Sequence, residues 1–181
     1  MVSFNLIKLM FLFSYISYIN TSTDCNPGYY MTTVGCYPCL GGTYFSNDKC
    51  YSCPAGTYSE TAYVQCVQCP PGTYSPEGSP ICIPCPAGTY NDLYGSALCP
   101  YCPDGTYSVS GAQYCDLCPV GTYSHEGYSI CYKCPEGSYS DIKGAKECGQ
   151  CPPGTYSFLG ATLCSKCPLG TTSDYGYAYC Y

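Results

Sequence analysis

The sequence contains no tryptophan, no arginine and a single histidine, and only 10% of its 181 residues are charged. Recognition of nucleic acids and of anionic membranes depends on clustered basic side chains, and six lysines against twelve acidic residues do not provide them. Leucine, isoleucine, valine and phenylalanine are sparse after residue 20. The composition therefore argues against a nucleic-acid-binding protein, a membrane-surface protein and a domain with an ordinary apolar core.

The single histidine leaves little scope for catalysis. His125 lies in a variable loop between Ser124 and Glu126, and no second histidine is present to activate a serine or cysteine nucleophile. The carboxylates are scattered about one per repeat and are interpreted as solubilising charge: Glu77, Asp92, Asp104, Asp116, Glu126 and Glu136. We therefore expect a protein that is not an enzyme and that binds no cofactor and no metal.

Cysteine, in contrast, is abundant, at 20 of 181 residues, which is typical of disulfide scaffolds in oxidising compartments. Between a lone Cys25 and a lone Cys180, the cysteines form nine C-x-x-C pairs that follow one another at steps of 14 to 17 residues. Units of this size are too small to hold a fold without covalent cross-links. The spacing predicts a linear array of tiny cross-linked modules.

The modules repeat the phrase C-P-x-G-T-Y-S-x-x-G-x-x-x-C-x-x, with small changes in some units and looser copies at the two ends, where Leu40 replaces proline and Thr172 replaces tyrosine. The P-x-G step favours a turn, because proline fixes φ and glycine accepts positive φ, whereas Thr-Tyr-Ser has strand character. A second glycine predicts the turn by which the strand returns. The fold class is therefore a small disulfide-rich, extended rod of about ten short β-hairpin modules with little other regular structure. The units, numbered 1 to 10, begin near Cys25, Cys39, Cys53, Cys69, Cys85, Cys102, Cys118, Cys134, Cys151 and Cys167. We expect a unit to contact mostly its neighbours, so that stability is nearly additive along the rod.

The phase of the repeat indicates the disulfide pairing. The array opens with the first cysteine of a unit and closes with the last, so pairing within units leaves none over. Each bridge then closes a loop of about a dozen residues, worth on the order of 3 kcal/mol. The predicted pairs are Cys25–Cys36, Cys39–Cys50, Cys53–Cys66, Cys69–Cys82, Cys85–Cys99, Cys102–Cys115, Cys118–Cys131, Cys134–Cys148, Cys151–Cys164 and Cys167–Cys180. The alternative is an interlocked pattern in which the members of a C-x-x-C pair reach into both flanking units.

Two other uses of C-x-x-C are less compatible with the sequence. Pairs about a dozen residues apart also match the spacing of zinc sites, but thiolate–zinc sites belong mostly to reducing compartments and only one histidine is present. A thioredoxin-like redox role needs one exposed pair on a β-α-β frame, not nine equivalent pairs. Disulfides are the preferred interpretation.

Residues 1–23 differ in kind from the rest of the chain. Lys8 precedes an apolar run over residues 9–16 and a polar stretch that begins at Asn20. This pattern is typical of a signal peptide cleaved near Asp24. An uncleaved anchor is the alternative, although the run is short for a span of about 20 residues. Asn20 also begins a glycosylation sequon at the cleavage boundary. We expect a secreted, extracellular product with no membrane span in the mature chain.

The phrase C-P-x-G-T-Y-S…G…C-x-x-C, over residues 25–181, resembles the ephrin-receptor-like cysteine-rich repeat of the growth-factor-receptor cysteine-rich group. It is also similar to the single-disulfide first half of tumour necrosis factor receptor modules. Such repeats occur in receptors, adhesion proteins, matrix proteins and large surface proteins of protists, mostly as rod-like spacers or binding surfaces. The chain departs from the receptors in having no transmembrane helix, kinase or ligand-binding globular domain. The resemblance implies a repeat type rather than a receptor.

The expected function is an extracellular binding or spacer module with a protein partner at the cell surface or in a matrix, and with no nucleic-acid ligand. Tyrosine, at 24 residues, is favoured at interfaces and would make the contacts. One alternative is a soluble receptor-like decoy that sequesters a cytokine-like ligand on two or three modules. Another is a fragment of a larger cell-surface protein. Variable positions such as Glu77, Tyr94, His125 and Tyr128 are the candidate contact residues.

Overall fold

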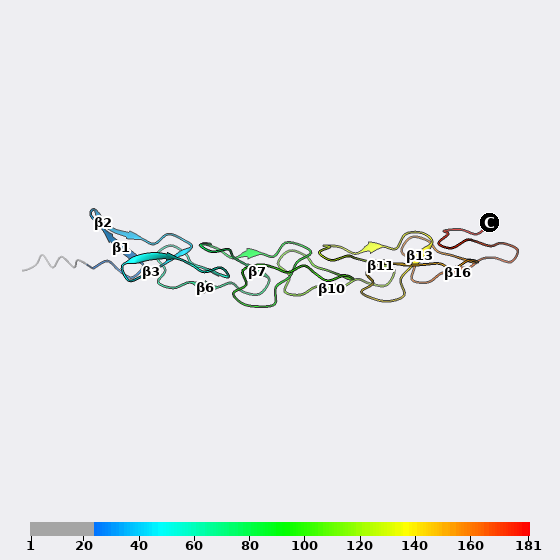
Figure 1. The fold of residues 1–181 in the computed structure, drawn as a ribbon, viewed down its shortest axis with the longest axis horizontal. Coiled ribbons are helices and arrows are strands. Elements are labelled where there is room, and N and C mark those ends of the chain that lie inside the picture. The colour runs from blue at the N-terminus through cyan, green and yellow to red at the C-terminus, as the bar shows by residue number, and fades with distance from the viewer. Residues whose placement is uncertain (1–23) are drawn as a thin grey trace, which may run out of the picture.

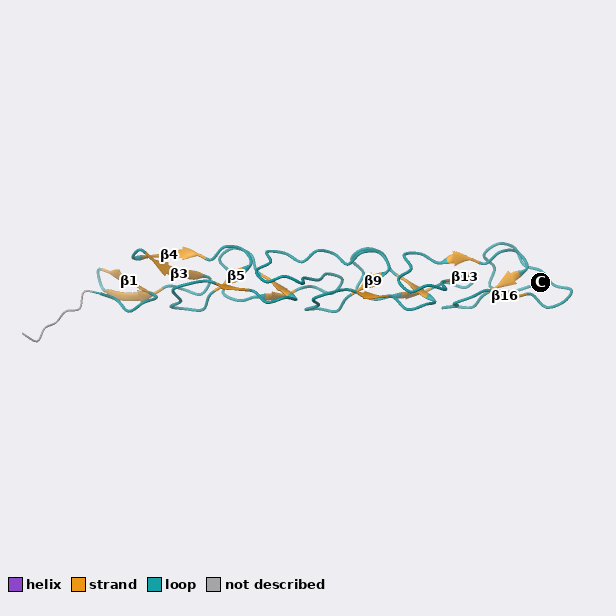
Figure 2. Cartoon of the chain, turned by 90° about the horizontal axis from the view of Figure 1, so that it is seen from below, coloured by secondary structure: helices purple, strands orange, loops and turns teal. Residues whose placement is uncertain are grey.

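The computed structural model describes residues 24–181, so the predicted signal peptide (1–23) and the sequon at Asn20 lie outside the described residues. The described chain is a thin rod, along which the units follow one another from end to end (Figure 1). Residues 24–181 consist of strands and loops alone (Figure 2), and this part of the chain has no helix able to span a membrane. The predicted fold class, an extended disulfide-rich array of short hairpins, is confirmed.

Eight two-stranded antiparallel sheets make up the regular secondary structure. Units 1 and 2 have four-residue strands, β1 (Tyr29–Thr32) with β2 (Gly35–Pro38) and β3 (Thr43–Ser46) with β4 (Lys49–Ser52). Units 3, 4 and 6 to 9 have two-residue strands: β5 (Thr57–Tyr58) with β6 (Val67–Gln68), β7 (Thr73–Tyr74) with β8 (Ile83–Pro84), β9 (Thr106–Tyr107) with β10 (Asp116–Leu117), β11 (Thr122–Tyr123) with β12 (Tyr132–Lys133), β13 (Ser138–Tyr139) with β14 (Gly149–Gln150), and β15 (Thr155–Tyr156) with β16 (Ser165–Lys166). In place of two paired strands, unit 5 has one isolated β-bridge and unit 10 has one pair of backbone hydrogen bonds.

The return strand is the dipeptide inside each C-x-x-C pair. In unit 3, Thr57 pairs with Gln68 and Tyr58 pairs with Val67. The residue that follows, Cys69, donates its N–H to the carbonyl of Gly56 at 2.9 Å. The sequence predicted the return turn but not the position of this strand. The C-x-x-C spacing thus completes one hairpin and fixes the first cysteine of the next unit against it.

Disulfides join the first and last cysteine of every unit, with Cα–Cα distances of 5.5–5.8 Å, and all twenty cysteines are paired. The pairs are those that the repeat phase predicts. The first cysteines of units 2 to 9 are fully buried, and the aliphatic side chain of Ala145 is the one other buried apolar group within residues 24–181. Sulfur therefore takes the place of an aliphatic core.

Two backbone hydrogen bonds recur at every junction between neighbouring units from unit 2 onward, and a side-chain hydrogen bond joins them at seven of these eight junctions. Between units 3 and 4, Gly56 N–H donates to the Ser75 carbonyl at 2.8 Å, and Gly78 N–H donates to the Cys53 carbonyl at 2.8 Å. The Ser75 hydroxyl donates to the Thr57 carbonyl at 2.9 Å. Both backbone bonds recur at all eight junctions between units 2 and 10. The serine of Thr-Tyr-Ser is therefore a junction residue, buried between units.

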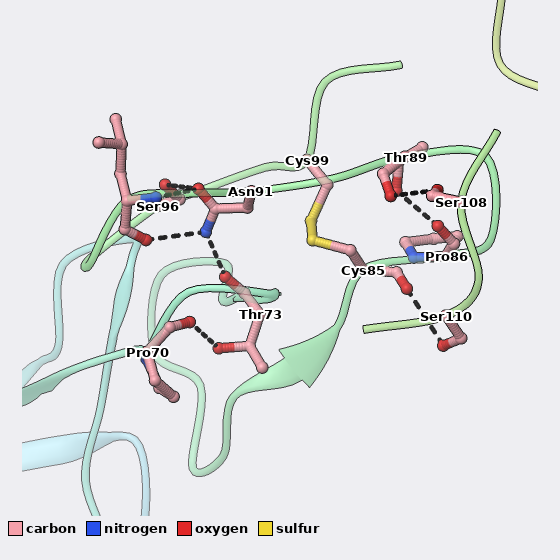
Figure 3. Close-up of a disulfide and its surroundings, with 11 residues drawn as sticks. Pro70, Thr73, Cys85, Pro86, Thr89, Asn91, Ser96, Cys99, Ser108 and Ser110 are labelled. Atoms are coloured by element: carbon pink, nitrogen blue, oxygen red, sulfur yellow. Dashed lines mark hydrogen bonds between the residues drawn. A yellow bond between two sulfur atoms is a disulfide. The ribbon is translucent and has the colours of Figure 1, made fainter. Parts of the chain in front are cut away.

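Unit 5 shows that the junction requires a donor rather than serine itself. Asn91 stands at the serine position, and its Nδ2 donates to the Thr73 carbonyl at 2.8 Å (Figure 3). Its Oδ1 accepts from the Ser96 hydroxyl and the Leu93 N–H, so the amide is fully used. At the next junction, Ser108 donates to the Thr89 carbonyl at 2.8 Å. The sequence indicates this role, because the residue at the serine position of units 3 to 10 is always a short side chain that can donate a hydrogen bond.

Contacts also reach the second neighbour, which differs from the expected nearest-neighbour array. A Cβ built on Gly56, in unit 3, would overlap the carbonyl oxygen of Gly95, in unit 5. The same overlap with a backbone oxygen two units on occurs at every P-x-G glycine from Gly28 to Gly137. Only a glycine hydrogen fits in this space, so the P-x-G glycine is required for packing as well as for its positive φ. The rod is stiffened over three units at a time.

We predict that Ala62→Gly stabilises units 2 and 3. Ala62 takes the second-glycine position of unit 3 with φ 67°, a left-handed conformation that costs an L-residue about 1 kcal/mol. Native-state hydrogen exchange at the Gly42 amide, which bonds to Ser59, measures the change. Gly78→Ala is the matched control, because φ is 72° there and the nearest atom to an added Cβ is 3.9 Å away. It should destabilise by a similar amount, and equal exchange in both variants would contradict the account.

Ser124→Ala should weaken the junction between units 6 and 7 by about 1–2 kcal/mol. Its hydroxyl is fully buried and donates to the Thr106 carbonyl at 2.9 Å. Ser140→Ala is the control, because that hydroxyl donates to Ile142 within its own unit. Exchange of the Gly105 amide should accelerate in the first variant, whereas the corresponding Gly121 amide should change little in the second. Equal acceleration in both would show that the hydroxyl does not link units.

Removing the bridge of unit 7 with Cys118→Ser and Cys131→Ser should cost on the order of 3 kcal/mol locally. Unit 7 packs against units 5 and 9 through the close approaches Gly88–Gly127 and Gly121–Gly160. Amides of units 5 to 9 should therefore lose protection from hydrogen exchange, whereas those of units 2 and 3 should keep it. Loss confined to units 6 to 8 would show that second-neighbour contacts carry little stability.

Candidate binding surface

The outer surface of the rod carries the apolar side chains that an ordinary domain would bury. The residue before the closing cysteine is a large apolar side chain in six of units 3 to 10, and each is 54–70% exposed: Ile81, Leu98, Tyr114, Ile130, Leu163 and Tyr179. The loop before the second glycine adds others, including Tyr94 at 68% and Phe158 at 66%. Because the core is made of sulfur and serine, these side chains have no interior to enter. The rod displays them along its length.

Four rings on unit 7 form a closed circuit, named here the unit-7 aromatic cluster. Tyr123, His125, Tyr128 and Tyr132 lie at its corners, and neighbouring ring centroids are 5.6, 5.4, 5.4 and 6.3 Å apart in that order around the circuit. Three of the four neighbouring pairs are inclined at 67–80°. Edge-to-face pairs of this kind are attractive, because the positive ring edge meets the negative ring face.

The hairpin and its loop position these four rings. Tyr123 lies on β11 directly opposite Tyr132 on β12, and side chains opposite each other on a ladder share one face. His125 and Tyr128 lie in the loop between the strands, where the Tyr128 N–H donates to the His125 carbonyl at 3.1 Å. This turn folds both loop rings onto the pair from the strands. Tyr132 is 48% exposed and Tyr128 is 37% exposed, so the cluster remains open to solvent.

A carboxylate from the preceding unit borders the cluster. Asp104 lies in the P-x-G turn of unit 6, and its Oδ1 accepts the Glu126 N–H at 2.8 Å. The same oxygen lies 4.0 Å from His125 Nδ1, and both side chains are 53% exposed. A contact this long and this exposed contributes little to stability. Its effect is to place negative charge beside the rings, across the junction between units 6 and 7.

The four candidate contact residues named from the sequence do not form one site. His125 and Tyr128 meet in the unit-7 aromatic cluster, with centroids 5.4 Å apart. Glu77 and Tyr94 are exposed on the loops of units 4 and 5. Tyr123 and Tyr132 were not among the candidate contact residues named from the sequence, although the sequence contains a pattern that indicates them. A tyrosine directly after a closing cysteine faces the repeat tyrosine across the ladder, as Tyr37 faces Tyr30 in unit 1.

A second group of rings lies at the end of unit 10. The centroid of Tyr177 is 6.0 Å from that of Tyr179 and 5.9 Å from that of Tyr181. The Tyr181 hydroxyl donates to Asp174 Oδ2 at 2.8 Å. This hydrogen bond to the Asp174 carboxylate raises the pKa of Tyr181, because it stabilises the protonated phenol. Unlike the rings of unit 7, these rings do not form a closed circuit.

Metal binding has no support in the described chain. Every cysteine is in a disulfide, so no thiolate remains to act as a ligand. Among residues 24–181, no group of three or more histidine, cysteine, aspartate or glutamate side chains is placed to hold an ion. The described carboxylates that the sequence marked as solubilising charge are exposed, with Asp104 the one that the structure brings to the aromatic cluster.

One family model matches the chain four times, over residues 56–93, 72–110, 105–146 and 121–158; it is described as tyrosine-protein kinase ephrin type A/B receptor-like. Each match begins at a P-x-G glycine and ends within two residues of the second glycine two units on. The family module therefore corresponds to the second-neighbour contact of the rod. No curated protein matches the chain. Because the matches together span residues 56–158, more than half of the sequence, the chain belongs to the ephrin type A/B receptor-like family of cysteine-rich repeats.

Proposed function

We propose that the chain is an extracellular, non-catalytic rod that binds a protein partner through its exposed tyrosine-rich surface and holds that surface at a fixed distance. The observation that carries the proposal is that the usual distribution of side chains between interior and surface is reversed. The interior consists of disulfides and serines, and the large apolar side chains lie outside. A rod built in this way depends on an oxidising compartment, and its surface is suited to contact.

The disulfides and the family support the extracellular part of the proposal. Cytosolic thiol reductants keep cysteines reduced, and units of this size do not fold without cross-links. Reduction would break the disulfides of the cysteines that, together with Ala145, are the buried apolar groups of units 2 to 9. A cysteine-rich repeat of the ephrin-receptor-like type fits the same compartment.

The exposed side chains support binding. Tyrosine is enriched at the centres of interfaces, because a rigid amphipathic ring covers a large area and loses little conformational entropy. Exposed apolar side chains that form a contiguous patch mark contact surfaces, whereas singly scattered ones are ordinary. The four adjoining rings of the unit-7 aromatic cluster form such a patch. Only 10% of the residues are charged, so few charged groups would repel a partner from the exposed apolar side chains.

The hydrogen bonds that the polar groups already make support a non-catalytic role. The repeated serine hydroxyls donate to carbonyls of the preceding unit and are buried there, so they are not free nucleophiles. His125 is surrounded by tyrosine rings and one carboxylate. The family to which the chain belongs consists of structural repeats.

A receptor-like decoy is the second candidate, and one observation favours it. The unit-7 aromatic cluster is confined to a single unit, whereas a pure spacer needs no such spot. A decoy would bind one ligand tightly at this cluster and lose it on substitution there. A spacer would keep its contacts distributed over many units.

Expression of the full chain in a eukaryotic secretory system tests the proposal. We expect the protein in the medium, with a start near Asp24, and an intact mass that shows no alkyl groups when thiols are blocked before reduction. Cys118→Ser is the matched control, because it should leave Cys131 free and add one alkyl group to any secreted chain. A retained chain with many alkylated thiols would contradict the extracellular assignment.

A further inference from the structure

We propose that the unit-7 aromatic cluster, with Asp104 beside it, binds an arginine or lysine side chain of a basic partner protein. The proposal rests on the proposed binding function and names the chemistry of the partner. It is carried by the closed ring circuit, by the carboxylate at its edge and by the distribution of charge along the rod.

The geometry of the circuit suits a cation. Aromatic faces attract a cation that lies within about 6 Å of the ring centroid, because the face of the π-system is negative. Neighbouring centroids in the cluster are 5.4–6.3 Å apart. A cation over the middle of the circuit therefore lies within that range of the ring centroids, and it would bind over the ring faces that no neighbouring ring edge covers. An isolated tyrosine such as Tyr94 offers one face.

The charge around the cluster has the right sign. Asp104 Oδ1 is 4.0 Å from His125 Nδ1, and Glu126 adds a second carboxylate in the same loop. Between Cys50 and Tyr132 the chain has six acidic residues and no lysine or arginine: Glu60, Glu77, Asp92, Asp104, Asp116 and Glu126. Units 3 to 7 therefore form a continuous acidic segment. Its negative charge increases the association rate of a basic partner protein.

The nearest cation of the chain is directed elsewhere. Lys133 follows Tyr132 on β12, and adjacent strand residues point to opposite faces. Carbons of the Lys133 side chain lie 3.3–3.7 Å from the Cβ position of Gly160, in unit 9. The lysine therefore covers the second-neighbour contact instead of the rings.

A titration of the intact, disulfide-bonded chain with a hexa-arginine peptide tests the proposal. Ring resonances of Tyr123, Tyr128, Tyr132 and His125 should shift in a saturable way in the NMR spectrum, and affinity should fall as salt rises. A hexaglutamine peptide of equal length should shift them little. If both peptides bind with the same affinity, the charge assignment is wrong.

Single variants separate the cluster from general attraction to an acidic rod. Tyr128→Leu keeps the apolar volume but removes one aromatic face, and it should weaken hexa-arginine binding about fivefold. Asp104→Asn removes the charge at the edge of the circuit and should weaken it severalfold. Tyr179→Ala is the matched control, since Tyr179 is an exposed ring that contacts another tyrosine ring but belongs to no closed circuit among residues 24–181. It should leave affinity unchanged.

Two outcomes overturn the proposal: unchanged affinity in Tyr128→Leu, or an equal loss in Tyr179→Ala. An amide spectrum of each variant verifies that the rod is intact, which the exposure of these side chains leads us to expect. Failure here removes the cation assignment alone. The extracellular function fails separately, if the secreted chain contains free thiols.

Discussion

The disulfide between the first and last cysteine of each unit is the constraint on which the rest of the molecule depends. It closes a loop of 11 to 14 residues, a length at which no apolar core can form. The first cysteine of each inner unit is fully buried and occupies the place of a core residue. Because the disulfides stabilise each unit in place of an apolar core, the side chains at variable positions are not needed in the interior and lie on the surface. The exposed apolar surface is a consequence of the disulfides.

Glycine and serine convert these closed loops into a single rod. The P-x-G glycine reaches a backbone oxygen two units away, and the serine hydroxyl donates to a carbonyl one unit away. Both contacts are made mostly to backbone atoms, so they do not depend on the side chains of the partner unit. This explains how neighbouring units can vary in surface residues and still stack. The four-ring circuit of unit 7 is one such variation on a shared frame.

Much of this fold follows from the sequence, because the repeat phase encodes it. The turn at P-x-G, the hairpins and the pairing of first with last cysteine all follow from local spacing. The second-neighbour contact does not, since nothing local shows that Gly56 meets Gly95. The hydrogen bond by which the serine links neighbouring units was not predicted either, although Asn91, at the same position, also supplies a donor. His125 and Tyr128 were marked as contact residues, whereas Tyr123 and Tyr132 needed the strand register to join them.

Disulfide mapping of the secreted protein tests the central claim most directly. Proteolysis without reduction, followed by mass spectrometry, assigns each bridge to two cysteines. The account predicts ten bridges, each within one unit, such as Cys53–Cys66 and Cys118–Cys131. Bridges that join cysteines of neighbouring units would contradict it, because the hairpins, the buried sulfur core and the displayed surface all require closure within the unit.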